Sequence, residues 1–137
     1  MLGRADTTAT STPATVPFAI GRRELDGRTS LISVQGDLDL ASAPRLKWTL
    51  VDALEEGHSK LILDLSLTTF MDSTALGVLV GVNRGLPGGG ILVLVCGRAN
   101  LLKIFELSGM DGAFVIAPTL ERALALAHLD PTAAQAG

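Results

Sequence analysis

The chain has 137 residues, of which 47% are apolar and 18% charged, and its formal net charge is −3. This length and composition are typical of one globular domain with a hydrophobic core and exclude a disordered chain. The few basic residues are scattered rather than clustered, so we expect no binding to nucleic acid. No apolar run approaches the roughly 20 residues that a membrane-spanning helix needs, so we expect no membrane partner.

We predict one folded domain over residues 16–130, with an unstructured segment on each side. Residues 1–15 are rich in Thr, Ala, Ser and Pro, which is typical of a disordered arm and not of a signal peptide. Residues 131–137 begin with Pro131, which should end the last helix and start a flexible tail. The single cysteine, Cys96, cannot form an internal disulfide, so we expect a buried thiol and a cytoplasmic protein.

The first predicted elements are two strands, residues 18–25 and 29–35. They are joined by Asp26-Gly27, a dipeptide typical of tight hairpin turns. A helix should follow, because Ser42 is placed to cap it and Pro44 suits its first turn. Apolar residues at helical spacing predict its buried face: Leu46, Leu50, Ala53 and Leu54.

The next strand and helix are separated by a polar triplet. Residues 61–65 predict a buried strand, and a second apolar run predicts a buried helix through about Asn83. Between them lie Asp72, Ser73 and Thr74, residue types that commonly cap helices. A hydroxyl here would be exposed beside a carboxylate and at a helix N-terminus, where the fold could tolerate an added phosphate.

The rest of the chain continues the alternation of strands and helices. Residues 91–95 are uniformly apolar, as expected of a parallel strand that is covered on both faces. The remaining predicted elements are a helix over 101–107 capped by Asn100, a strand over 114–117, and a helix capped by Thr119 that ends near Leu129. Together the elements predict an α/β fold, in which a mixed, mainly parallel sheet with an N-terminal β-hairpin packs with about four to five helices.

Three short motifs occur in a characteristic order. They are Gly36-Asp37-Leu38-Asp39, Met71-Asp72-Ser73-Thr74-Ala75-Leu76-Gly77, and Phe105-Glu106-Leu107-Ser108-Gly109-Met110. They are similar to the loop after the second strand, the phosphorylation motif and the end of the third helix in the STAS domain family, and the chain resembles its bacterial anti-sigma factor antagonists most closely. The resemblance covers about residues 16–129, departs at Ala75, where the family often has glycine, and implies the STAS fold.

The resemblance also implies a function. Such proteins are not enzymes: they bind an anti-sigma factor that is also a serine kinase, and so free a sigma factor. Phosphorylation of the serine after the motif's aspartate abolishes this binding, and a phosphatase restores it. By position the acceptor is Ser73. The expected partner-binding residues are Asp37, Asp39, Asp72, Ser73, Thr74, Leu76 and Gly77.

Other interpretations of these residues stay open. Asp37 and Asp39 could equally be solvated loop acids. The chain could be an accessory STAS subunit of a transport or signalling complex, in which the triplet is only a cap and a contact surface. An enzyme with Ser73 as nucleophile would need a base, and neither His58, expected in an exposed turn, nor His128 lies in a catalytic motif. The apolar stripes imply core positions, so we expect no cofactor and no metal.

Overall fold

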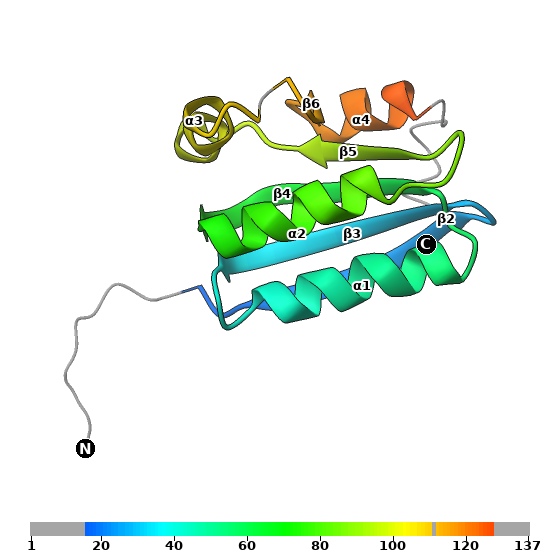
Figure 1. Cartoon of the computed structure of the whole chain (residues 1–137), viewed down its shortest axis with the longest axis horizontal. Coiled ribbons are helices and arrows are strands. Elements are labelled where there is room, and N and C mark those ends of the chain that lie inside the picture. Colours follow the sequence, from blue (N-terminus) through cyan, green and yellow to red (C-terminus); the bar gives the residue numbers. More distant parts are fainter. Residues whose placement is uncertain (1–15, 111, 128–137) are drawn as a thin grey trace, which may run out of the picture.

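The computed structural model describes residues 16–110 and 112–127, which form a five-stranded sheet and four helices (Figure 1). In chain order the elements are β2 (Ala19–Asp26), β3 (Thr29–Leu38), α1 (Ala43–Glu55), β4 (Lys60–Met71), α2 (Ser73–Arg84), β5 (Ile91–Val95), α3 (Ala99–Leu107), β6 (Val115–Ala117) and α4 (Leu120–Leu126). The predicted arm, the predicted tail, His128 and Leu129 lie outside the described residues.

The sheet has the predicted mainly parallel topology. Its strands lie in the order β2-β3-β4-β5-β6, with β2 antiparallel to β3 and every other neighbouring pair parallel. The hairpin turn is stabilised by Asp26, whose Oδ1 accepts a hydrogen bond of 2.8 Å from the Arg28 backbone N–H. The predicted α/β fold with an N-terminal hairpin is therefore confirmed.

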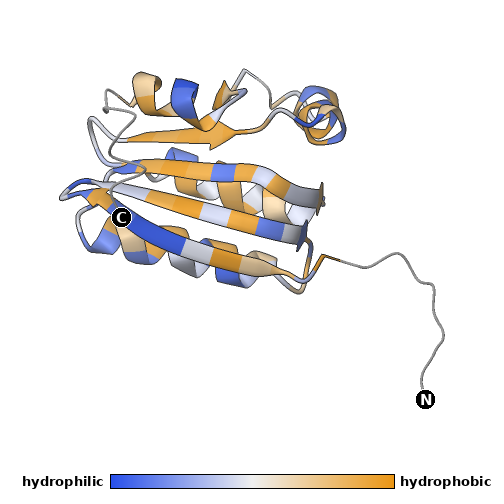
Figure 2. Ribbon diagram, turned by 180° about the vertical axis from the view of Figure 1, so that it is seen from behind, coloured by the Kyte–Doolittle hydropathy of each residue, from blue (hydrophilic) through white to orange (hydrophobic). Residues whose placement is uncertain are grey.

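The sheet separates two hydrophobic cores. Side chains of α1, α2 and α3, among them Leu50, Leu79 and Phe105, pack against one face, and α4 packs against the other through Ala123 and Leu124. Seen from behind, β2, β3 and β4 lie in front of α1 and α2; hydrophobic residues run along β5 and much of β3 and β4, whereas the middle of β2 is hydrophilic (Figure 2). Burial of each large apolar side chain contributes about 1.5–3 kcal/mol, so these cores provide most of the driving force for folding.

Two of the predicted side-chain caps are wrong, although Ser42 does occupy the N-cap position of α1. Ser42 makes no side-chain cap on α1, because its hydroxyl points back into the preceding loop and donates to the Asp37 carbonyl at 2.7 Å. Asn100 lies inside α3, whose N-cap is Arg98, and its side-chain amide donates to the Thr69 carbonyl. Thr119 does cap α4, since its hydroxyl accepts from the Arg122 N–H at 3.2 Å.

Strand β4 is longer than predicted and runs to Met71, not Leu65. Its second half mixes polar and apolar residues and pairs with β3: Leu67 lies opposite Gln35 and Met71 opposite Leu38, and the register shifts twice along this pair of strands. The buried Thr68 hydroxyl also donates to the Val34 carbonyl at 3.0 Å. As a result β3 and β4 end side by side.

The prediction that His58 is exposed is wrong, because its side chain is only 4% exposed. The β2–β3 hairpin folds over it: Nδ1 lies 2.6 Å from Ser30 Oγ, and Nε2 lies 3.2 Å from Glu24 Oε2. Ser30 is fully buried and His58 nearly so, which keeps the serine hydroxyl away from any substrate, whereas the Glu24 side chain is largely exposed. The three side chains join the hairpin to the α1–β4 connection and have a structural role.

Candidate phosphorylation and partner-binding site

Helix α2 is capped by Asp72 alone. Asp72 has an extended backbone, and its Oδ1 accepts from the N–H groups of Thr74 at 2.9 Å and Ala75 at 3.1 Å. A carboxylate at this position satisfies N–H groups that the helix cannot pair internally and complements the positive end of its dipole. Of the three residues in the triplet, only Asp72 therefore has the capping role that the sequence suggested.

Ser73 is the first residue of α2 and is exposed. Its hydroxyl is not needed for the cap, because the Asp72 carboxylate already fills that role. A group attached to this hydroxyl would lie in solvent beside a helix N-terminus, an environment that favours anions. Modification of Ser73 would thus leave the core and the helix unchanged.

The loop acids lie at the same edge of the sheet as Ser73. The Asp72 N–H donates to the Leu38 carbonyl at 3.0 Å, which fixes the start of α2 against the end of β3. Asp37 accepts from the Thr69 hydroxyl at 2.7 Å. Asp39 accepts from the Ser42 N–H, and this hydrogen bond lowers the pKa of its carboxyl group, so that it is ionised at neutral pH. Asp37 near the end of β3, Asp39 in the following loop and Asp72 at the start of α2 therefore lie at the edge of the sheet where Ser73 is exposed.

Two exposed apolar side chains lie near these acids and were not predicted as site residues from the sequence. Leu40, between β3 and α1, is 72% exposed, and Phe70, near the end of β4, is 47% exposed. Single apolar residues beside buried strands are indistinguishable from core positions until the register is known. Leu40 directly follows Asp39, and Phe70 lies opposite Asp37 in the β3–β4 pair, so both apolar side chains adjoin the acidic ones.

The last two predicted site residues differ in their surroundings. Leu76 is half-buried and packs against the main core, so only part of its side chain is available to a partner. Gly77 is exposed and, like Thr74, faces the neighbouring helix α1 across a surface groove. The predicted site thus extends from the loops along one side of α2.

Within the described residues, no histidine lies near Ser73 to serve as a base. His58 is the histidine within the described residues; it precedes β4, whereas Ser73 follows this strand. A strand of 12 residues spans about 40 Å. In residues 16–110 and 112–127 there is also no cluster of His, Cys, Asp and Glu that could hold a metal ion, and no helix long and apolar enough to cross a membrane.

Comparison with known families agrees with this geometry. The family model of the STAS domain matches residues 22–123, which include the β3–α1 loop, Ser73 and α3. The chain belongs to the STAS domain family. The resemblance recognised in the three sequence motifs is thereby confirmed, and the STAS fold explains the mixed sheet and its hairpin.

Similar STAS proteins are anti-sigma factor antagonists. The anti-sigma-B factor antagonist of Bacillus subtilis strain 168 is 35% identical over 80 residues, or 58% of this chain and 72% of that protein. An anti-sigma factor antagonist from Mycobacterium paratuberculosis has a solved structure with a TM-score of 0.76 and 26% identity, covering 82% of this chain and 95% of that one. The Bacillus cell fate determinant SpoIIAA in its phosphorylated form shares the fold, with a TM-score of 0.63 and 23% identity over 80% of this chain and 99% of that one.

The cap on α2 gives a stability prediction for this STAS domain. Replacing Asp72 by alanine removes both cap hydrogen bonds and should lower the free energy of unfolding by about 1 kcal/mol. Urea denaturation followed by circular dichroism measures this loss. Ser73→Ala is the matched control and should change stability far less; equal losses in the two variants would show that Ser73 shares the cap.

Proposed function

We propose that this STAS protein is an anti-sigma factor antagonist whose activity is switched at Ser73. With a free hydroxyl at Ser73 it binds an anti-sigma factor that is also a serine kinase, and the sigma factor is released. The kinase transfers the γ-phosphoryl group of ATP to the Ser73 oxygen, and the complex dissociates. A phosphatase hydrolyses the phosphate ester and restores binding. The protein itself performs no catalysis and acts in the cytoplasm with these partners.

The main support for this proposal is that the residue that caps α2 and the proposed phosphate acceptor are two different residues. Because Asp72 holds the start of α2, the Ser73 hydroxyl is exposed and has no structural duty there. It also occupies the position of the serine in the STAS phosphorylation motif. A kinase can therefore reach the Ser73 hydroxyl, and the fold can accommodate a phosphoserine at this position.

The charges around Ser73 explain why a phosphate would end binding. Phosphorylation adds about −1.5 to −2 charges at neutral pH. Asp37, Asp39 and Asp72 already make this edge of the sheet acidic, and a docked partner must cover it. Desolvating a phosphate among carboxylates, or placing it against an acidic kinase group, costs several kcal/mol. The switch needs no large change in the fold.

The solved structure of phosphorylated SpoIIAA supports this mechanism. That protein has the same fold while it carries a phosphate. In this chain the helix N-terminus at Ser73 favours a phosphate within the isolated protein. The electrostatic penalty would then arise in the complex, where water is excluded, and not in the free protein.

Phosphorylation of the purified full-length protein tests the proposal. The protein is incubated with ATP and, in turn, with each anti-sigma factor of the same genome that has a kinase domain. The phosphate is then located by mass spectrometry of tryptic peptides, with fragmentation that distinguishes Ser73 from Thr74. We expect one kinase to add a single phosphate at Ser73 and none to Ser73→Ala. Labelling that persists in Ser73→Ala, or an absence of any kinase that binds or labels the protein, would overturn the proposal.

A further inference from the structure

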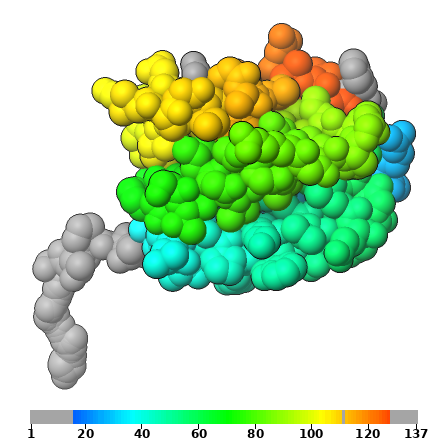
Figure 3. Space-filling model, in the orientation of Figure 1, coloured from blue at the N-terminus to red at the C-terminus, as the bar shows by residue number. Residues whose placement is uncertain are grey.

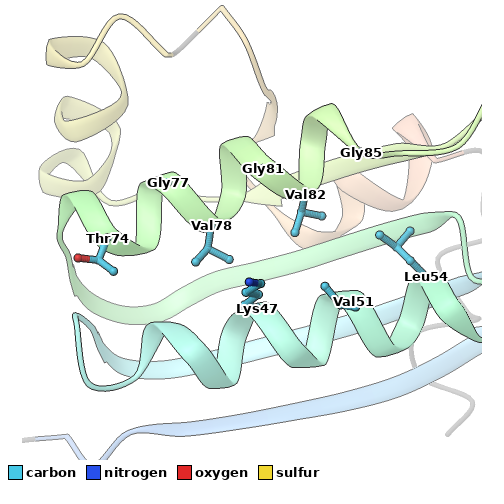
Figure 4. A pocket seen from close by; sticks show the side chains of 9 residues that line it. All are labelled: Lys47, Val51, Leu54, Thr74, Gly77, Val78, Gly81, Val82 and Gly85. Carbon is cyan, nitrogen blue, oxygen red and sulfur yellow. The ribbon is translucent and has the colours of Figure 1, made fainter.

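Helices α1 and α2 form adjacent bands on one face of the molecule, and a groove lies between them (Figures 3 and 4). Its volume is about 590 Å³. Most of the residues that line it are apolar or glycine: Val51 and Leu54 from α1, and Gly77, Val78, Gly81, Val82 and Gly85 along α2. Lys47 is the charged residue among those that line it. The groove is therefore an open, largely apolar surface with one cation on its wall.

Two of the glycines in the groove, Gly77 and Gly81, lie inside α2 and are not required by packing or by backbone conformation, whereas Gly85 closes the helix. A Cβ atom added at Gly77 or Gly81 would meet nothing within 4 Å, and neither residue has a positive φ. Glycine inside a helix lowers stability relative to alanine, so these positions weaken α2 without improving packing. Their effect is to leave the backbone of α2 bare along the groove. Such a surface allows the backbone of a second helix to approach closely.

The groove is continuous with the surface around Ser73. Thr74 lines one end of it and directly follows the serine (Figure 4). A stable complex usually covers about 800 Å² on each partner, which is more than a few loop residues provide. A kinase docked over Ser73 must therefore cover neighbouring surface as well. The groove is the apolar surface that adjoins it along α2.

We propose that the groove holds a helix of the anti-sigma kinase, a proposal that rests on the function proposed above. The groove follows α2 from Thr74 to Gly85, about 17 Å at 1.5 Å per residue, which matches three turns of a helix. The bound helix has a narrow face of small and apolar side chains against the glycines. It carries an acidic side chain opposite Lys47. In helix-in-groove binding of this kind, a few side chains on one face of the bound helix make the anchoring contacts.

Filling the groove away from the serine tests this proposal. Gly81→Leu lies two turns of α2 beyond Ser73 and should weaken binding of the unphosphorylated protein to the kinase at least tenfold. Because the site has room for a side chain, its midpoint of thermal unfolding should stay equal or rise. The matched control is Ala125→Leu on the exposed side of α4, which should leave the affinity unchanged. Lys47→Glu should also weaken binding, more strongly at low salt.

The outcomes separate this proposal from the proposed function. If the wild-type protein binds the kinase and is phosphorylated at Ser73, but Gly81→Leu and Lys47→Glu bind equally well, the groove proposal is overturned and the function stands. If the wild-type protein binds no kinase, both are overturned. If sedimentation shows that the wild-type protein is a dimer, which Gly81→Leu dissociates without loss of kinase binding, a second copy of the chain occupies the groove instead.

Discussion

Phosphorylation of Ser73 should weaken binding to the anti-sigma kinase by at least about 100-fold, because a penalty of only 2.8 kcal/mol has this effect. The phosphate adds charge to an edge that already holds Asp37, Asp39 and Asp72. At an interface, like charges that cannot be solvated cost several kcal/mol. Isothermal titration calorimetry of the kinase with the unmodified and the enzymatically phosphorylated protein measures the ratio directly.

Three variants separate charge from the loss of the hydroxyl. Ser73→Asp should show a weaker form of the same effect, whereas Ser73→Ala should bind like the wild-type protein. Ser59→Asp adds the same charge just before β4, at the opposite end of that strand from Ser73, and should bind normally. The proposed switch would be wrong if the phosphorylated protein and Ser73→Asp bound as tightly as the wild-type protein.

Replacing Phe105 by alanine should lower the free energy of unfolding by about 3–5 kcal/mol. Its side chain is fully buried in the core beneath α3. Its ring also meets that of Phe114 edge to face, with centroids 5.7 Å apart and an angle of 68° between the planes. Truncation removes this contact and leaves a cavity that the close-packed core cannot fill. Such a loss is a large part of the 5–15 kcal/mol by which most domains are stable.

Chemical denaturation of Phe105→Ala and of Leu107→Ala measures this effect within one helix. Leu107 is 77% exposed, so its truncation should change stability by less than about 0.5 kcal/mol. Both residues lie in the third STAS motif, and only one of them faces the core. Similar losses in the two variants would contradict the described orientation of α3.

The three motifs that identified the family have different physical roles. Gly36 has a φ of +88°, and a Cβ there would lie 2.9 Å from the Val16 carbonyl oxygen, so the first motif requires glycine for structural reasons. The third motif ends α3: Gly109 has a φ of +74°, and the Met110 N–H donates to the Phe105 carbonyl, a pattern that closes many helices. The third motif also holds an exposed serine, but the Ser108 hydroxyl donates to the Phe105 carbonyl, whereas the Ser73 hydroxyl of the second motif is exposed beside a cap that Asp72 already provides.

Local patterns in the sequence predicted the elements that depend on local forces. The Asp26-Gly27 turn, the buried residues Leu46 and Leu50 of α1 and the Thr119 cap are determined by neighbours in the chain. The misses depend on contacts between distant segments. The second half of β4 mixes polar and apolar residues and becomes a strand because β3 pairs with it. His58 is buried because the β2–β3 hairpin, which carries Glu24 and Ser30, folds over it.

The candidate site, like the fold, was only partly predictable from the sequence. Sequence spacing placed Asp72, Ser73 and Thr74 at the start of a helix and favoured Thr74 as a cap or as a hydrogen-bonding neighbour of Ser73; the prediction that Thr74 is a cap is wrong, because its backbone N–H donates to the Asp72 carboxylate. Only the backbone geometry shows that Asp72 alone is the cap. The exposure of Leu40 and Phe70 likewise depends on where β3 and β4 end together, which no local pattern predicts.

The single-residue cap on α2 also bears on how this regulation can evolve. Since Asp72 stabilises the helix on its own, the neighbouring position is free to change without a cost in folding. Under the proposed switch, a lineage that replaced Ser73 by alanine would keep a stable protein that the kinase could no longer turn off. A lineage that regained serine would recover control in a single substitution. On that proposal, permanent activity and reversible control are one mutation apart on an unchanged scaffold.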